Sequence, residues 1–424
     1  MTDPIVPPTP APAAEEPAAP RLEMRATPNP PSASLGVGAT APSAGLSAGE
    51  STAGTVMPPP PPPQPPEMKP TTCAVTWLLA EGSPAIQRRT LLDIGGESHR
   101  RAALARVAYG SRQGWHLLMM QDSDGTWPGG MLTIPKGTSC VGVGTIVAYQ
   151  RLIELGWDPE SPGLATTKRL LFRLLAEDDD PSYLHELMPT VMDEAHIKRG
   201  RLHLREAAAA ALAQAGYESD PRLRGAARRL TDRLGAYLRS SLAQKPWVRV
   251  GNQHVLPEEV AAPSFHTIMM LAHMPLFRSE HHEVMDRLYP YLAQPWPRQA
   301  AIQYVGDQLV EQPQLVLGDF LATRNSMDAD MPAALAWLEL MARLGFLRRH
   351  EGWLRLFDRL LDDRDRKGIW HPPRSVVMPD YVPSWAWPGM PLDDHVDPAQ
   401  AASIDVTFRL GLIARLSGRD VELL

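Results

Sequence analysis

Helix endings of one kind recur along the chain, and their spacing constrains the fold more than any other feature. Runs of apolar residues at helical spacing end in Leu155-Gly156-Trp157, in Ala215-Gly216-Tyr217 and in Leu344-Gly345-Phe346. Glycine adopts the left-handed conformation that ends many helices, and the following aromatic side chain can pack on the last helical turn. The interval from Gly156 to Gly216 is 60 residues, and the interval from Gly216 to Gly345 is 129, about twice as long. Helical hairpins that repeat at such a spacing predict a solenoid or a closed ring.

Weaker endings extend this series. They lie at Tyr109-Gly110, at His273–Phe277 near the middle of the longer interval, and at Ser417-Gly418. Six helical hairpins in roughly 350 residues favour an all-α fold, a closed α/α toroid, over an open HEAT-like array, whose units are usually ~40–47 residues long. Alternating strand patterns are rare, and Trp247–Val255 is expected to form a short hairpin or a loop.

The first 70 residues differ in composition from the rest. Residues 1–70 contain no Phe, Trp or Tyr but 20 of the 44 prolines. Such a segment cannot bury enough apolar surface to offset its ordering entropy, so we expect a disordered Pro/Ala-rich tail and one folded domain at residues 71–424. Pro58–Pro66, broken only by Gln64, favours polyproline II. It would act as a spacer, or as a ligand for an aromatic-lined groove on a protein partner.

Charge and cysteine content exclude several classes of protein. The net charge is −6, and residues 1–70 carry −3 of it, so no strongly basic region predicts nucleic acid as a partner. Cys73 and Cys140 form neither a disulfide framework nor a metal-binding pair, which suggests a reducing, cytoplasmic setting without a metal or cofactor. There is no secretory signal and no run of 18 apolar residues, so no transmembrane segment is expected.

A short loop motif gives the most specific signal. Gly114–Trp127 reads GWHLLMMQDSDGTW, in which a helix is followed by Gln121, an Asp-rich turn, Gly125 and Trp127. Glycine allows the tight turn, the glutamine side chain can bond backbone groups at a helix terminus, and the tryptophan can stack over the next helix. A partial copy, LLDDRDRKGIW, contains Gly368 and Trp370.

This motif resembles the QW motif of squalene–hopene cyclases and related triterpene cyclases, whose toroid is shared by protein prenyltransferase β-subunits. The resemblance extends over residues 73–424, and other segments look similar to bacterial chains of this superfamily. His116 stands where the motif usually has an aromatic residue, and the copy around Trp370 lacks the glutamine. QW motifs are structural in that family, so the resemblance implies an α/α toroid and not an activity.

The acids that the family uses for catalysis are not in their usual pattern. Class II cyclases protonate their substrate from a DxDD motif, which this chain lacks, and the nearest run includes Asp179 and Asp180. Asp393 and Asp394 begin a DDxxD string of the kind that holds magnesium in class I enzymes, but prolines flank it. These four aspartates are the candidate catalytic acids, and a solvated loop is the alternative for each pair.

Aromatic and histidine side chains could line a cavity. Phe265 and His266 open an apolar helix, where capping or packing is the alternative role. The segment around Trp370 and His371, with Trp385 and Trp387, is rich in aromatic residues for a loop region. Such a set could line an apolar pocket or stabilise a carbocation, and ordinary loop packing is the alternative.

Three hypotheses follow for function. The chain could be a toroid protein without the cyclase acid motif that binds an apolar, isoprenoid-like ligand or a protein partner. It could instead be an isoprenoid cyclase or prenyltransferase that uses non-standard acids. Finally, it could be a structural scaffold. An enzyme needs acids that point into a cavity, a binding protein needs only the cavity, and a scaffold would fill it with side chains.

Overall fold

The computed structural model describes residues 68–135, 140–176, 194–251, 253–295, 299–321, 331–372 and 385–424. The chain divides into a unit Met1–Pro62 and a unit Pro63–Leu424, and every described residue belongs to the second. Residues 1–67 of the predicted disordered tail therefore lie outside the described residues.

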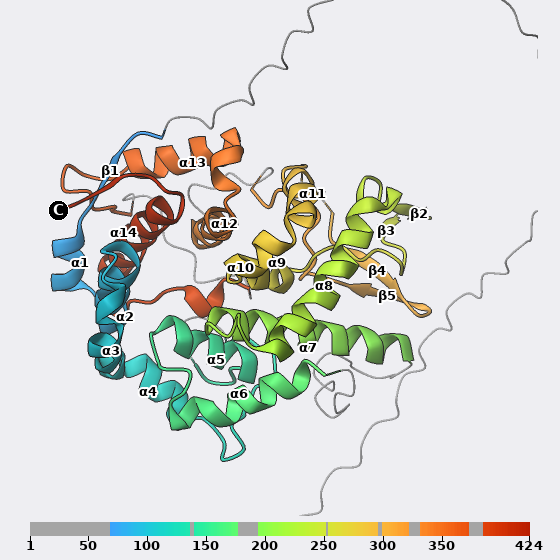
Figure 1. Cartoon of the computed structure of the whole chain (residues 1–424), viewed down its shortest axis with the longest axis horizontal. Coiled ribbons are helices and arrows are strands. Elements are labelled where there is room, and N and C mark those ends of the chain that lie inside the picture. The colour runs from blue at the N-terminus through green and yellow to red at the C-terminus, as the bar shows by residue number, and fades with distance from the viewer. Residues whose placement is uncertain are drawn as a thin grey trace, which may run out of the picture. The chain divides into compact units, whose positions relative to one another are not determined.

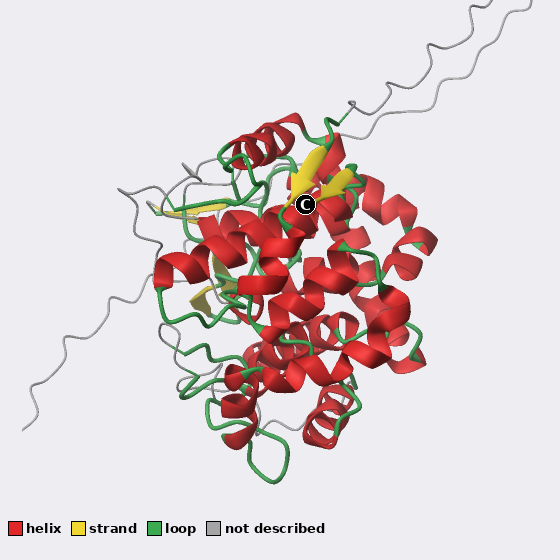
Figure 2. Ribbon diagram, turned by 90° about the vertical axis from the view of Figure 1, so that its left-hand side faces the viewer, coloured by secondary structure: helices red, strands yellow, loops and turns green. Residues whose placement is uncertain are grey.

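The described part is mostly helical, as the sequence predicts, and its strands are short pieces (Figure 2). The α-helices are α1 (Val75–Glu81), α2 (Pro84–Arg89), α3 (Arg101–Leu104), α4 (Arg112–Met119), α5 (Thr145–Glu154), α6 (Pro162–Leu174), α7 (Glu194–Gln214), α8 (Pro221–Arg239), α9 (Phe265–Ala272), α10 (Pro275–Glu280), α11 (His282–Leu292), α12 (Met331–Arg343), α13 (Glu351–Asp362) and α14 (Pro398–Leu416).

In the part of the chain that the structure describes, three two-stranded sheets accompany the helices. Strand β1 (Thr71–Cys73) pairs in parallel with β6 (Val421–Leu423) and joins the two ends of the described part. Strands β2 (Val248–Val250) and β3 (Gln253–Val255) pair antiparallel, which is the hairpin alternative of the two predicted for Trp247–Val255. Strands β4 (Ile302–Val305) and β5 (Gln308–Glu311) form a second antiparallel hairpin, which was not predicted from the sequence.

One series of helices makes consecutive contacts (Figure 1). Helix α5 packs on α7, α7 on α9, α9 on α12, and α12 on α14, which in turn contacts α2 and the π-helical segment Thr90–Ile94. An ion pair between Arg89 and Glu154 joins α2 to α5. The other long helices pack outside this series, with α6 and α8 against α7 and α11 against α8. The apolar core runs through these contacts.

The predicted glycine endings are confirmed at the helices of this series. Gly156, Gly216 and Gly345 have φ angles of 90°, 89° and 75° and follow α5, α7 and α12. At each ending, the N–H of the aromatic residue donates to a carbonyl five residues back, from Trp157 to Leu152 at 3.0 Å, from Tyr217 to Leu212 at 3.1 Å and from Phe346 to Met341 at 2.8 Å. Because these bonds belong to the Schellman motif, the three helices end in the same way.

The two loop motifs have equivalent geometries. In the first loop, Trp127 N–H donates to the hydroxyl of Thr145 at 3.0 Å, and in the second, Trp370 N–H donates to the hydroxyl of Thr407 at 2.9 Å. Each loop is thereby tied to the next helix of the series, α5 or α14. Gln121 acts at a helix terminus as expected, because its Nε2 donates to the Gly163 carbonyl in the first turn of α6 at 2.9 Å.

The Trp127 indole also bonds the preceding helix. Its ring nitrogen donates to the carbonyl of Leu117 in α4 at 2.8 Å. The backbone N–H of the same residue bonds Thr145 of the next helix, α5. Trp127 therefore ties the loop to helices on both sides.

Replacing Gly125 by alanine is expected to destabilise the protein by about 2–5 kcal/mol. The left-handed conformation costs a residue with a Cβ about 1–2 kcal/mol, and overpacking adds about 1–3 kcal/mol. Gly125 has φ 86°, and a Cβ there would lie 2.8 Å from Thr166 Cγ2 and 2.9 Å from the Thr167 nitrogen. Gly142→Ala is the matched control, because Gly142 has φ 76° and a Cβ there would meet nothing within 4 Å. If urea denaturation showed the same loss of unfolding free energy in Gly125→Ala and Gly142→Ala, the close contact at Gly125 would not contribute as described.

Candidate functional site

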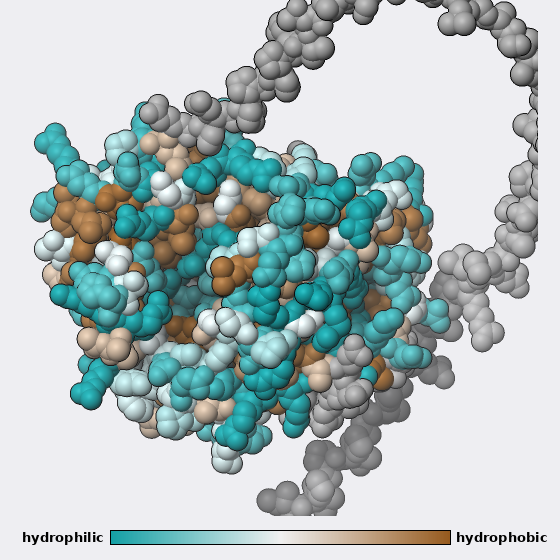
Figure 3. All heavy atoms as spheres, viewed as in Figure 1, coloured by the Kyte–Doolittle hydropathy of each residue, from teal (hydrophilic) through white to brown (hydrophobic). Residues whose placement is uncertain are grey.

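A cavity of about 790 Å³ lies where the carboxyl ends of four helices converge. It is lined by Trp157 beyond the end of α5, Gln214 at the end of α7, His273 after α9 and Arg343 at the end of α12. The opposite wall comes from α2, Thr90–Ile94 and α3. Figure 3 shows a hollow left of centre, with hydrophilic residues at its floor, in the region where Figure 1 places α2, α5 and α12. Its volume is within the ~300–1,000 Å³ that ligand sites occupy.

An arginine holds two of these helix ends together. The guanidinium of Arg278 in α10 donates to the Ala272 carbonyl at 2.8 Å and to the Arg343 carbonyl at 2.7 Å. The last carbonyls of a helix lack partners within the helix and carry a partial negative charge. Arg278 supplies hydrogen-bond donors and a positive charge to the carboxyl ends of α9 and α12 at the same time. It therefore holds these two helix ends close together.

Arg89 occupies the α2 side of the cavity as a buried cation. Its Nε lies 2.9 Å from Asp93 Oδ2, and its Nη1 bonds Glu154. Burial opposes the charge of Arg89, but Glu154 and Asp93 outweigh this effect and raise its pKa. Glu154 also accepts a hydrogen bond from the side-chain amide of Gln214. Both Glu154 oxygens are thus occupied.

Glu339 is the centre of a second buried ion network. Its Oε1 lies 2.9 Å from Arg343 Nη2, and its Oε2 lies 2.6 Å from Arg409 Nη1. Burial disfavours the carboxylate, but Arg343 and Arg409 dominate and lower the pKa of Glu339 to about 2. Glu339 is therefore ionised at neutral pH. Arg409 also lies 3.7 Å from Asp405, one turn earlier on α14.

His273 presents a neutral imidazole to the cavity. Burial and the nearby charges of Arg343, Arg89 and Arg278 hold the pKa of His273 well below its usual range, although Glu339 opposes them. A neutral imidazole has one nitrogen that accepts and one that donates a hydrogen bond. His273 can therefore bind a ligand hydroxyl or amide in either role.

Two further arginines on this wall are not paired with an acid. Among the described residues, neither Arg88 nor Arg101 forms an ion pair with a carboxylate, although Asp93 and Asp158 lie close enough to affect the pKa of Arg88. The guanidinium of Arg88 lies over Gly156, where a Cβ would come within 2.9 Å of Nη1. Glycine at this position thus serves both the helix ending and the placement of Arg88.

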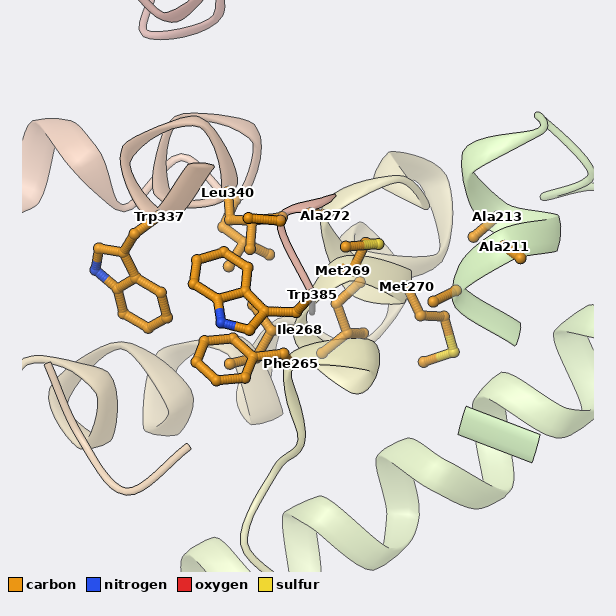
Figure 4. Close-up of a cluster of buried hydrophobic side chains, with 14 of the residues drawn as sticks. Ala211, Ala213, Phe265, Ile268, Met269, Met270, Ala272, Trp337, Leu340 and Trp385 are labelled. Atoms are coloured by element: carbon orange, nitrogen blue, oxygen red, sulfur yellow. The ribbon is translucent and has the colours of Figure 1, made fainter. Parts of the chain in front are cut away.

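The aromatic residues predicted to line a cavity pack against one another. Phe265 and Trp385 are stacked with ring centroids 4.2 Å apart, beside Trp337 (Figure 4). Trp370 is buried within its loop, whereas His371 is exposed and bonds Asp365 at 3.1 Å. These residues do not line the cavity described above. The side chain of Trp387 lies outside the described residues.

Asp393, Asp394 and His266 do not line this cavity. Asp393 is buried and accepts hydrogen bonds from the N–H groups of Ser83 at 2.7 Å and His395 at 3.0 Å, while Asp394 is exposed. His266 is half-buried, with its ring centroid 5.5 Å from that of His203. Asp179 and Asp180 lie outside the described residues. Their roles as site residues remain predictions.

The charged residues of the cavity were not identified from the sequence. For the buried ion network that includes the lining residue Arg343, a usable signal was present, because Glu339 interrupts the apolar run AALAWLELMA, and Arg409 interrupts TFRLGLIA. A charge on the apolar face of a buried helix needs a partner, since an isolated buried charge is very costly. Which partners meet depends on long-range packing that a single sequence does not show.

Comparisons of the chain with protein-family models, curated proteins and solved structures find no match. Within the described ranges, no group of three or more His, Cys, Asp or Glu residues could hold a metal ion. No helix in the same ranges is both long enough and apolar enough to cross a membrane.

Proposed function

We propose that the chain is an α/α toroid protein that binds a small polar molecule with an anionic group in the cavity at the helix ends. One observation carries this proposal. Charged side chains from α2, α5 and α12 meet at a cavity of ligand size. The same cavity is lined by His273 and by Arg88 and Arg101, which form no ion pair with a carboxylate among the described residues.

The toroid is supported by the order of helix contacts. The series from α5 through α7, α9, α12 and α14 to α2 is closed by the Arg89–Glu154 ion pair, so its members can form one ring with the other helices outside. The equivalent Trp127 and Trp370 loops and the common glycine endings support an internal repeat. The resemblance to terpene-cyclase toroids is in keeping with this arrangement.

The buried ion networks favour a binding role over a purely structural one. Removing charges from water is costly, and an apolar cluster of similar volume is often at least as stable as a buried ion pair. Glu154 and Arg343 both line the cavity and take part in these networks. The networks hold these side chains in fixed positions beside the cavity, which lowers the entropy cost of binding a ligand.

The anionic group would be held by Arg88 and Arg101. Guanidinium groups bind phosphate and carboxylate through charge-assisted hydrogen bonds, and neither arginine is neutralised by an ion pair within the described ranges. His273 and Gln214 would bond the polar remainder of the ligand. Leu92 and Ile153 belong to the apolar part of the lining.

Two groups at the cavity are unsuited to acid–base catalysis near pH 7. An effective general acid or base has a pKa near the working pH. The pKa of His273, which lines the cavity, lies well below its usual range, and that of Glu339, which bonds the lining residue Arg343, is about 2. An isoprenoid-like ligand, or an isoprenoid cyclase or prenyltransferase activity, remains the alternative from the sequence.

Binding of pyrophosphate to the full chain tests the proposal. We expect measurable binding by isothermal titration calorimetry, with a loss of about tenfold or more in Arg88→Gln, because this change removes a charge-assisted hydrogen bond, and of about two- to fivefold in Arg101→Gln, because Arg101 is exposed. Arg106→Gln is the matched control, since Arg106 is exposed near this wall and does not line the cavity.

A second arm separates the ligand classes. Native mass spectra of the purified chain would reveal a co-purified molecule, and a sugar phosphate, an isoprenoid diphosphate and an uncharged polyprene would be titrated side by side. Preference for the sugar phosphate supports the polar site. Preference for the polyprene, or binding that is unchanged in both arginine variants, would overturn it.

A further inference from the structure

A second polar cavity, of about 350 Å³, lies near the other end of α7. Arg199 lines it, whereas Gln214 of the same helix lines the first cavity. Fifteen residues separate the two positions, which corresponds to ~22 Å along a helix axis. The two cavities are therefore different sites.

Two glutamines hold Arg199 in place. Its Nε donates to Gln312 Oε1 at 3.2 Å, and its Nη2 donates to Gln303 Oε1 at 2.8 Å. Gln303 is buried, and its amide nitrogen donates to the carbonyls of Pro257 at 3.0 Å and Val260 at 2.8 Å. Because these bonds orient the amide, its oxygen is directed at Arg199. A neutral partner positions the guanidinium without cancelling its charge.

The lining of this cavity carries more positive than negative charge. Lys198, Arg199 and Arg233 are its cations and Glu258 is its acid. Within the described ranges, neither Lys198 nor Arg233 forms an ion pair or a side-chain hydrogen bond. Glu206 lies close enough for Arg199 and Arg233 to lower its pKa, although burial has the larger effect and raises it.

We propose that this cavity binds the oxyanion group of a small organic acid or phosphate ester, with Arg199 as its fixed ligand and Lys198 and Arg233 as additional cations. An arginine that is already oriented loses little entropy when it forms a charge-assisted pair with an oxyanion. Leu202, Tyr304 and Val305 provide the less polar part of the wall. The small volume limits the ligand to a few groups besides the anion.

The test uses the full chain carrying Arg88→Gln and Arg101→Gln, so that the first cavity does not contribute. Inorganic phosphate and acetate are titrated separately to distinguish the two oxyanions, with glycerol as the uncharged control. Hydrogen exchange of the amides in Ile302–Glu311 gives a local readout, because β4 supplies three residues of the wall. We expect protection there by at least one anion, and weaker binding as chloride concentration rises.

Variants of the site locate the effect. Arg199→Gln should weaken binding about tenfold or more, and Arg233→Gln about two- to fivefold, because an exposed charge contributes less than a fixed one. Arg228→Gln, also exposed on α8, is the matched control and should leave binding unchanged. Arg199→Lys keeps the positive charge and should retain part of the affinity. It therefore shows whether Arg199→Gln weakens binding through loss of charge or through misfolding. Protection by neither anion, or an Arg199→Gln variant that binds like the control, would overturn the proposal, whatever the outcome for the first cavity.

Discussion

Replacing Glu339 by glutamine is expected to lower the free energy of unfolding by about 3–5 kcal/mol, because removing one member of a buried ion network leaves its partners uncompensated. Arg343 and Arg409 both bond this carboxylate, and the side chain of Arg409 is only 3% exposed. Urea denaturation at neutral pH measures the loss. Glu351→Gln is the control, since Glu351 pairs with Arg355 on the exposed face of α13.

A double variant separates the missing charge from misfolding. Arg409→Met removes the most buried partner, so Glu339→Gln combined with Arg409→Met should cost clearly less than the sum of the two single changes. The pH dependence gives an independent check. The pKa of Glu339 falls from 4.5 to about 2 on folding, so its stabilising effect is present above pH 4.5 and is lost as the pH falls towards 2. If Glu339→Gln matched the Glu351→Gln control, the network would not contribute as described.

Local chemistry made much of the fold predictable from the sequence. Glycine at Gly156 and Gly216 is required by the φ angle that ends the helix, and the following aromatic residue identifies the ending without tertiary information. The turn at Gly125 is similarly local, so its loop and the copy at Gly368 were identified in advance. The hairpin of β4 and β5 was not predicted. Each strand has only four residues, and with Gln303 and Gln308 among them the alternation of apolar and polar residues is too short to recognise.

The candidate site was much less predictable. The aromatic residues Phe265 and Trp385 were plausible cavity residues from composition, but an aromatic pair can fill space as well as enclose it, and here the rings stack. Glu154 and Arg89 are 65 residues apart, and nothing in the local sequence shows that they meet. The series of helix contacts from α5 to α2 brings them together. A predicted ring therefore does not by itself specify which side chains meet in it.

Three histidines that the fold holds neutral make the stability of the protein sensitive to mild acid. Burial, with help from His266 and Arg199, lowers the pKa of His203 to about 3, and burial lowers that of His266 to about 4. The pKa of His273 also lies well below 6.5. Because each histidine is neutral in the folded protein but takes up a proton near pH 6.5 when unfolded, the unfolded state binds more protons below that pH. Glu206 acts in the opposite direction, since burial raises its pKa.

We therefore expect the free energy of unfolding to fall steeply as the pH decreases from 6.5 to about 4, by up to about 1.4 kcal/mol per pH unit for each of these histidines. Urea denaturation at closely spaced pH values measures this slope. His266→Gln removes one titrating group and should reduce the slope by about a third, because the three histidines contribute in the same direction. His254→Gln is the matched control, since His254 lies exposed on β3. A slope that is the same in both variants would show that His266 is not held neutral by the fold.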